Sequence, residues 1–252
     1  MVCKVINTMG GPRLMLLSNS KLHGQEWFDW CSGSLKAFFE KSSVKDVLFI
    51  PYAIKEDGYD GYVDIVRPGF KKLGLNVEGI QTKKNPVTAV QEAQAIFVGG
   101  GNTFLLLKTL YENNLIEPIR ERVLNNGIPY VGSSAGTNVA TRSINTTNDM
   151  PICFPSSFEA LKLVPFNINP HYIDAEANST HMGETREQRI QEFLEQPDCA
   201  PVLGLREGSY LLVENDKATV GGIKAAILFQ KGQKAINYET GSDVTFLLNG
   251  NC

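Results

Sequence analysis

The chain has 252 residues, of which 42% are hydrophobic and 20% charged, and its formal net charge is −3. These values are ordinary for a globular protein, and the weak negative charge gives no electrostatic reason to expect nucleic acid as a partner. No apolar run approaches the roughly 20 residues that a membrane-spanning helix needs.

The cysteines indicate a reducing compartment. Five are scattered along the chain, and no two have the C-x-x-C spacing of a metal site or redox motif. Unpaired thiols of this kind are typical of cytosolic proteins, where they serve mostly as packing groups. The apolar run at the N-terminus is also too short for a secretory signal. We therefore expect a cytoplasmic protein that needs neither a metal ion nor a cofactor.

From the N-terminus to residue 131, apolar runs alternate with segments of helical period. The apolar runs predict buried strands at 13–18, 47–51, 75–80, 95–98 and 128–131. The segments between them predict helices at 25–40, 62–73, 87–94, 103–111 and 116–125. Pro68 argues against an unbroken second helix. This alternation is typical of an α/β fold in which a mostly parallel sheet carries helices on both faces.

After Met150 the pattern changes. Residues 183–195 predict one charged helix, and short apolar runs follow at 202–205, 210–213 and 218–220. Turn residues separate these runs, which predicts a C-terminal β-hairpin edge on the main sheet. A last apolar run at 245–248 suggests one more strand. We find no repeat or linker, so residues 1–252 are expected to form a single domain. The edge of the C-terminal strands offers a pairing surface for a homodimer.

The clearest motif is Gly132-Ser133-Ser134-Ala135-Gly136, between a predicted strand and a helix-compatible run. This is the G-x-S-x-G pattern in its required strand–turn–helix context, with Ser134 as the nucleophile. Small neighbours let the backbone bend sharply and let substrate approach, and the turn directs the Ala135 N–H at a developing oxyanion. The alternative is a tight βα turn that binds an anion or nothing.

A serine nucleophile needs a base, because its hydroxyl is weakly nucleophilic at neutral pH. The chain has three histidines, His23, His171 and His181. His171 follows the apolar run at 161–168, and a strand end at the sheet edge is where an α/β enzyme places its loop chemistry. His23 lies in a polar stretch and His181 precedes the charged helix. We expect His171 to be the base.

The third group should be a carboxylate that orients the imidazole. Asp149, in the stretch 146–151, and Glu207, in the stretch 204–208, are the two candidates. The residues alone rate them equal. With Glu207 the chain order is Ser, His, Glu, which differs from the Ser, Asp/Glu, His order of α/β-hydrolases.

A glycine run, Gly99-Gly100-Gly101-Asn102-Thr103, follows one predicted strand and opens a helix. Glycines let backbone N–H groups approach a ligand closely. Phe104 stands where a dinucleotide fingerprint needs glycine, and the run has no P-loop pattern. A second oxyanion donor or a cradle for a substrate carboxylate is the better interpretation, and a plain helix-start turn is the alternative.

Together these stretches resemble the peptidase E family of aspartyl dipeptidases. The matching segments occur in order within residues 10–230: 97–104, 130–138, 146–152, 168–171 and 183–190. The resemblance implies a class I glutamine-amidotransferase-like fold and hydrolysis of α-aspartyl dipeptides (Asp-X) through an acyl-enzyme. The small peptide would be the partner, with no nucleic acid and no membrane. One departure is Ser133, where bacterial members are expected to carry an aromatic residue.

Carried over by position, the resemblance implies that Ser134 is the nucleophile, His171 the general base and Glu207 its paired carboxylate. Asp149 matches a further acid near the active site, so the division of labour between the two carboxylates stays open. The resemblance places the oxyanion and substrate-binding groups at Gly100, Gly101, Asn102 and Ala135.

Arg186 lies in a segment that aligns with the charged helix of the family, and the resemblance suggests that it grips the aspartate side chain. A guanidinium can hold a carboxylate with two parallel hydrogen bonds. For Arg189, three residues on, we expect an exposed arginine paired with Glu184 or Glu187. Two other functions remain: a cyanophycinase-like or other aspartyl-amide serine hydrolase, and a non-catalytic small-molecule sensor.

Overall fold

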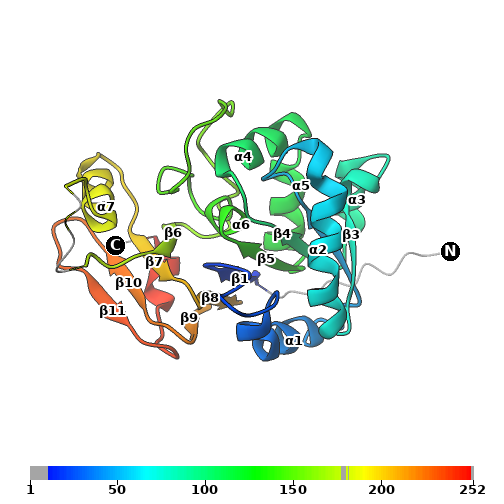
Figure 1. Cartoon of the computed structure of the whole chain (residues 1–252), viewed down its shortest axis with the longest axis horizontal. Helices are drawn as coiled ribbons and strands as arrows, with labels where there is room; N and C mark the ends of the chain where they lie inside the picture. Colours follow the sequence, from blue (N-terminus) through cyan, green and yellow to red (C-terminus); the bar gives the residue numbers. More distant parts are fainter. Residues whose placement is uncertain (1–10, 177–179, 181, 251–252) are drawn as a thin grey trace.

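The computed structural model describes residues 11–176, 180 and 182–250, and within them two β-sheets organise the chain (Figure 1). The larger sheet has the strand order β3-β2-β4-β5-β1-β8-β9. Its strands are β1 (Arg13–Leu17), β2 (Asp46–Ile50), β3 (Asn76–Gly79), β4 (Ile96–Val98), β5 (Pro129–Ser133), β8 (Ser209–Glu214) and β9 (Lys217–Gly222). The first five run parallel, and β8 and β9 form an antiparallel hairpin added beside β1. The predicted parallel sheet with a C-terminal hairpin edge is confirmed.

Helices cover both faces of this sheet. They are α1 (Ser32–Glu40), α2 (Tyr59–Lys72), α3 (Pro86–Glu92), α4 (Thr103–Glu112), α5 (Ile116–Arg120) with a wider turn at Glu121–Asn125, and α6 (Ala135–Asn138). The strands are buried on both sides, with alternate residues facing alternate layers. Leu14 and Leu16 pack with α4, α5 and α6, whereas Met15 and Leu17 pack with α1 and α2. Short 3₁₀ turns occur at Asp29–Cys31, Glu56–Gly58 and Ile80–Thr82.

The helix α2 runs unbroken through Pro68, where the sequence argued for an interruption. Its buried face, which includes Val63, Val66 and Phe70, packs onto the sheet. Tertiary packing of an apolar face stabilises a helix more than local propensity does, and here it outweighs the backbone hydrogen bond that proline cannot donate.

The second sheet has the order β11-β10-β7-β6 and lies at the other end of the molecule (Figure 1). Its strands are β6 (Asn167–Tyr172), β7 (Val202–Arg206), β10 (Ala226–Phe229) and β11 (Ile236–Tyr238), and α7 (Arg186–Glu195) packs on it. Neither β10 nor β11 was predicted from the sequence. The run at 202–205 was expected on the main sheet, whereas β7 pairs with β6 and β10.

The strand predicted at 245–248 is wrong: Thr245–Asn249 is a 3₁₀ turn. The Asp243 carboxylate accepts the Thr245 N–H at 2.8 Å, and the Thr245 hydroxyl accepts the Ala218 N–H at 3.0 Å. Such side-chain bonds to the backbone favour a turn over a strand. Leu247 is buried by this turn.

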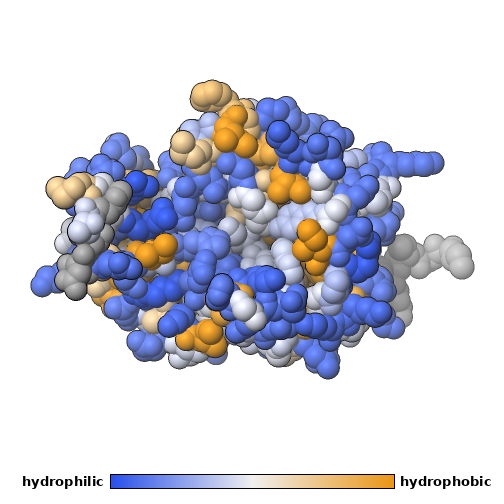
Figure 2. All heavy atoms as spheres, viewed as in Figure 1, coloured by the Kyte–Doolittle hydropathy of each residue, from blue (hydrophilic) through white to orange (hydrophobic). Residues whose placement is uncertain are grey.

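None of the helices in the described residues has the length and apolar character needed to cross a bilayer. Apolar side chains do gather on the loop between α6 and β6, seen as orange and tan at the top of Figure 2. They belong to Met150, Ile152, Phe154 and Phe158.

Phe97, at the centre of the sheet, lies fully buried in an aromatic cluster. Its ring stacks on Phe49 at 5.1 Å and meets Phe28 and Phe70 edge-on at 5.6 and 5.2 Å. Removing such a ring costs its burial and leaves a cavity.

We expect Phe97→Ala to lower the free energy of unfolding by about 3–5 kcal/mol. The matched control is Phe154→Ala, at a position that is 85% exposed, which should change stability by less than about 0.5 kcal/mol. Urea unfolding followed by tryptophan fluorescence measures both. Equal losses in the two variants would contradict the assigned core.

Candidate active site

Ser134 occupies the sharp turn between β5 and α6. Its backbone has φ 54° and ψ −110°, a strained conformation for a residue with a side chain. The Ser134 N–H donates to the Leu17 carbonyl at 3.2 Å, and its own carbonyl accepts the Thr137 N–H at 2.9 Å. These bonds hold the turn, so the predicted strand–turn–helix context of the G-x-S-x-G motif is confirmed.

The two motif glycines are sterically required. A Cβ on Gly136 would lie 2.1 Å from the Val98 carbonyl oxygen, and one on Gly132 would lie 2.5 Å from the Gly136 carbonyl oxygen. Real Cβ atoms do not approach backbone atoms so closely. Gly136 therefore lets the turn pack against the end of β4, and Gly132 lets the turn close on the start of α6.

His171 and Glu207 meet Ser134 from the second sheet. The His171 Nε2 atom lies 3.0 Å from Ser134 Oγ, and His171 Nδ1 lies 2.7 Å from Glu207 Oε1. His171 belongs to β6 and Glu207 directly follows β7, its parallel neighbour. Of the other histidines, His23 is exposed, and His181 lies outside the described residues.

The ends of β6 and β7 are tied together beside these residues. The Arg206 guanidinium holds the Asp174 carboxylate with two contacts of 2.6 Å, from Nε and from Nη2. Hydrogen bonding from Arg206 lowers the pKa of Asp174, so this carboxylate is ionised at neutral pH. The ion pair therefore links Arg206, which precedes Glu207, to Asp174, three residues after His171.

Asp149 serves a different element. Its Oδ2 atom accepts the Thr103 N–H at 2.7 Å, the Thr103 hydroxyl at 2.6 Å and the Thr147 hydroxyl at 3.2 Å. Thr103 is the first residue of α4, where free N–H groups favour a negative charge. Of the two carboxylates that the sequence could not rank, Glu207 contacts His171, and Asp149 fixes the helix that follows the glycine run.

The glycine run lies directly against the serine. A Cβ on Gly100 would be 3.1 Å from Ser134 Cβ and 3.6 Å from Ser134 Oγ. Gly101 has φ +134°, and its Cβ would lie 2.4 Å from the Ala53 carbonyl oxygen. Within the described part of the chain, no acceptor takes the N–H groups of Gly100, Gly101 or Ala135.

Asn102 lies in the same run, and its backbone N–H and both side-chain polar atoms bond to the protein. Its N–H donates to the Ala53 carbonyl at 2.7 Å, its Oδ1 accepts the Leu105 N–H at 3.1 Å, and its Nδ2 donates to the Met150 carbonyl at 2.8 Å. Asn102 therefore caps α4 and holds the neighbouring loop.

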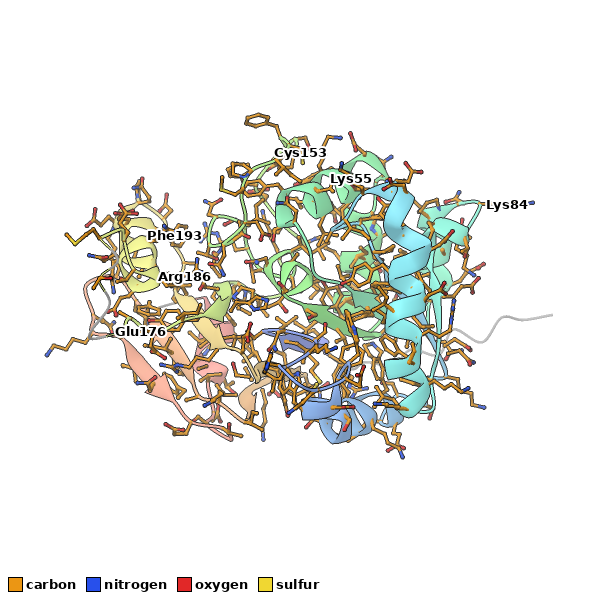
Figure 3. All side chains as sticks on the ribbon, in the orientation of Figure 1. Lys55, Lys84, Cys153, Glu176, Arg186 and Phe193 are labelled. Carbon is orange, nitrogen blue, oxygen red and sulfur yellow. The ribbon has the colours of Figure 1, made fainter. Side chains whose placement is uncertain are left out.

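Arg186 begins α7, whose start is fixed by reciprocal hydrogen bonds between Thr185 and Gln188. Figure 3 shows Arg186 on the side of α7 toward β6. The side chain is half-buried, and this burial, with the nearby Arg189, lowers the pKa of Arg186. Among the residues that the structure describes, Arg186 has no ion-pair partner. Arg189 pairs with Glu184 at 3.6 Å, as the sequence predicted.

A serine, a histidine and a carboxylate linked in this order on an α/β fold form the arrangement of a serine hydrolase. The model of peptidase family S51 matches residues 14–221. The chain belongs to this family of serine-type peptidases, and the resemblance inferred from the motifs is confirmed.

Relatives and solved structures agree with this membership. The chain is 54% identical over 235 residues to the probable alpha-aspartyl dipeptidase of Drosophila melanogaster, covering 93% of this chain and 97% of that protein. It is 47% identical over 236 residues to peptidase E of Streptomyces coelicolor, with coverages of 94% and 95%. A peptidase from an acI-B1 actinobacterium superposes with a TM-score of 0.71 at 18% identity, covering 93% of this chain and 97% of that one. A putative peptidase E from Listeria monocytogenes gives 0.63 at 23%, with coverages of 85% and 100%. These two structures support the fold.

Sequence reasoning missed the residues that hold the site in place. Thr103, which binds Asp149, is one, and the polar residues just after β1 are others. A signal was present for the latter, because a polar stretch directly after a fully buried strand lies at the edge where an α/β sheet places its chemistry.

We expect Glu207→Gln to slow the reaction of Ser134 with a fluorophosphonate probe by about 100-fold or more, since an amide cannot hold the imidazole in the productive tautomer. Asp149→Asn should react at close to the wild-type rate, because an amide oxygen still accepts the bonds from Thr103. Labelling rates at matched protein concentration measure both. The reverse ranking would make Asp149 the partner of His171.

Proposed function

We propose that this chain hydrolyses α-aspartyl dipeptides, Asp-X, through an acyl-enzyme formed on Ser134. The observation that carries the proposal is the hydrogen-bonded series Ser134–His171–Glu207, with distances of 3.0 and 2.7 Å. The names of the relatives, an alpha-aspartyl dipeptidase and peptidase E, support the substrate class. They favour it over a cyanophycinase-like activity, and the complete series argues against a non-catalytic sensor.

In the proposed reaction His171 is the general base. Its Nδ1–H donates to the Glu207 carboxylate, which leaves the Nε2 lone pair facing the Ser134 hydroxyl. Nε2 takes the hydroxyl proton as Oγ attacks the scissile carbonyl carbon. The C–N bond then breaks, and His171 returns the proton to the departing amine. Water attacks the acyl-enzyme by the same route and restores the free serine.

Backbone donors would stabilise the negative charge on the carbonyl oxygen. Gly100 lies against Ser134 and Ala135 directly follows it, and among the described groups none accepts the N–H groups of Gly100, Gly101 or Ala135. Donors fixed before the reaction cost no reorganisation when the charge develops. We assign Asn102 and Asp149 to holding this loop, since Oδ1 and Nδ2 of Asn102 and Oδ2 of Asp149 already bond to the protein.

Arg186 is the proposed partner of the substrate's aspartate side chain. It is half-buried near Tyr172, the residue after His171, and carries a full charge without a carboxylate partner among the described residues. Leaving a partly buried cation unpaired is unfavourable, so a bound carboxylate would stabilise this region. The guanidinium can bind that carboxylate with two parallel bonds.

We also propose that the protein is cytoplasmic and that two copies can associate. Cys31, Cys153 and Cys199 are free thiols, which fits a reducing compartment. Association would use the outer edge of a C-terminal strand, such as β11, whose other edge pairs with β10.

Aspartyl selectivity tests the proposal directly. We expect the wild type to cleave Asp-p-nitroanilide and to be far slower on the Leu, Glu and Asn analogues. Ser134→Ala should abolish the activity, because no nucleophile remains at the turn. Release of p-nitroaniline measures the rates. A wild type that ignores every analogue, yet reacts with a fluorophosphonate probe at Ser134, would keep the nucleophile and refute the substrate class.

The role of Arg186 is tested with its neighbour as control. We expect Arg186→Ala to lower kcat/KM for aspartyl substrates by about 10- to 100-fold, the loss of a charge-assisted bidentate contact. The rate of fluorophosphonate labelling should not change, since the probe carries no carboxylate. Arg189→Ala removes an exposed arginine of the same helix and should leave both rates unchanged. Equal effects of the two substitutions would contradict the assignment.

A further inference from the structure

The residues directly after β1 join the two halves of the site. Ser134 comes from the large sheet, whereas His171 and Glu207 come from the small one, so their geometry depends on contacts between the sheets. Ser18 makes one such contact. It is fully buried, its hydroxyl accepts the His171 N–H at 2.9 Å, and it donates to the Leu205 carbonyl at 2.9 Å.

His171 needs this contact because its backbone is irregular. The pairing of β6 with β7 shifts register between Pro170 and Tyr172, and His171, between them, has φ 52°. A bulge of this kind re-aims a side chain and releases the N–H of the bulged residue from the strand ladder. The Ser18 hydroxyl accepts that released N–H, so the buried group is not left without a partner.

We propose that Ser18 is a positioning residue for the reaction. By closing the bulge at His171, its hydroxyl holds the imidazole in line with Ser134 Oγ. Ser18 does not touch the reacting atoms, and it acts only through the His171 backbone. This inference rests on the proposed role of Ser134 and His171.

The residues on either side of Ser18 bond to the backbone at Ser134 and beside Glu207. The Leu17 carbonyl accepts the Ser134 N–H at 3.2 Å, and the Asn19 Oδ1 accepts the N–H of Gly208, the residue after Glu207, at 2.8 Å. Ser20 donates to the hydroxyl of Ser133 at 2.6 Å. Residues 17–19 thus bond to the backbone of the nucleophile, of the base and of the residue after Glu207. The relative positions of the three catalytic side chains therefore depend on this one segment.

The size of the effect follows from what the hydroxyl satisfies. Without Ser18 Oγ, a buried N–H in a strained conformation loses its acceptor, and the bulge can relax. A misplacement of about 1 Å at a catalytic group costs on the order of 100-fold in rate. We therefore expect Ser18→Ala to lower kcat by about 10- to 100-fold, with KM within about two-fold of the wild type, because Arg186 and the glycine run are untouched.

The experiment compares four proteins: wild type, Ser18→Ala, Ser18→Thr and Thr141→Val. Ser18→Thr keeps the hydroxyl and should recover most of the lost kcat. Thr141→Val removes another fully buried hydroxyl, bonded to the carbonyls of Asn138 and Ser143, and should lower stability without changing kcat. Each protein is assayed for Asp-p-nitroanilide cleavage and for fluorophosphonate labelling of Ser134, both expressed per folded molecule from the unfolding curve.

The probe separates the failure of this inference from that of the proposed function. A wild type that is labelled but does not cleave aspartyl substrates refutes only the substrate class, and the labelling rate of Ser18→Ala still tests Ser18. Ser18→Ala labelled and turning over at the wild-type rate overturns the positioning role alone. A kcat loss that Ser18→Thr does not recover also overturns it. A wild type that shows neither reaction overturns the nucleophile and this inference together.

Discussion

The 3.0 Å contact between Ser134 Oγ and His171 Nε2 is the interaction on which the rest of the structure depends, because it joins two sheets. Both residues have backbones that side-chain-bearing residues rarely adopt, with φ 54° at Ser134 and φ 52° at His171. Strain of this kind persists only where surrounding structure fixes it. Here the end of β1 does so on both sides: the Leu17 carbonyl binds the nucleophile turn, and the Ser18 hydroxyl binds the bulge.

The glycines and the two carboxylates near Ser134 have different structural roles. Gly136 lets the turn lie against β4, Gly132 lets the turn close on α6, and Gly100 lets the glycine run reach the serine. The N–H groups of that run must stay accessible and fixed in position. The Asp149 carboxylate fixes the end of the run by accepting the first N–H of α4. The negative charge of Asp149 stabilises the start of a helix, whereas the carboxylate of Glu207, hydrogen-bonded to Nδ1 of His171, orients a base. The two carboxylates therefore have separate tasks set by their neighbours.

The sequence was sufficient to predict the parallel sheet and the nucleophile, because both depend on local patterns. Continuous apolar runs in strands such as 47–50, which is buried throughout, and the short spacing of Gly132 to Gly136 are readable along the chain. The second sheet was not predicted, since the residues of β10 and β11 form brief runs whose partner strands are distant in sequence. The residues alone left the choice between Glu207 and Asp149 open for the same reason: each lies in a plausible loop, and only the pairing of β6 with β7 brings Glu207 to His171. At 245–249, a hydrogen bond to the Asp243 side chain favours a 3₁₀ turn over the strand that the apolar run suggested.

Solvent exposure of His171 and Glu207 limits the electrostatic contribution that each can make. The Glu207 side chain is 55% exposed and that of His171 36%, so solvent screens the attraction between them. Glu207 would then act mainly by direction, holding the imidazole through a 2.7 Å hydrogen bond, and less by the strength of its charge. Because solvent weakens this orienting bond, the backbone that carries the ring must share in orienting it. The bulge at His171, closed from behind by a fully buried hydroxyl, supplies the rigidity that an exposed carboxylate cannot.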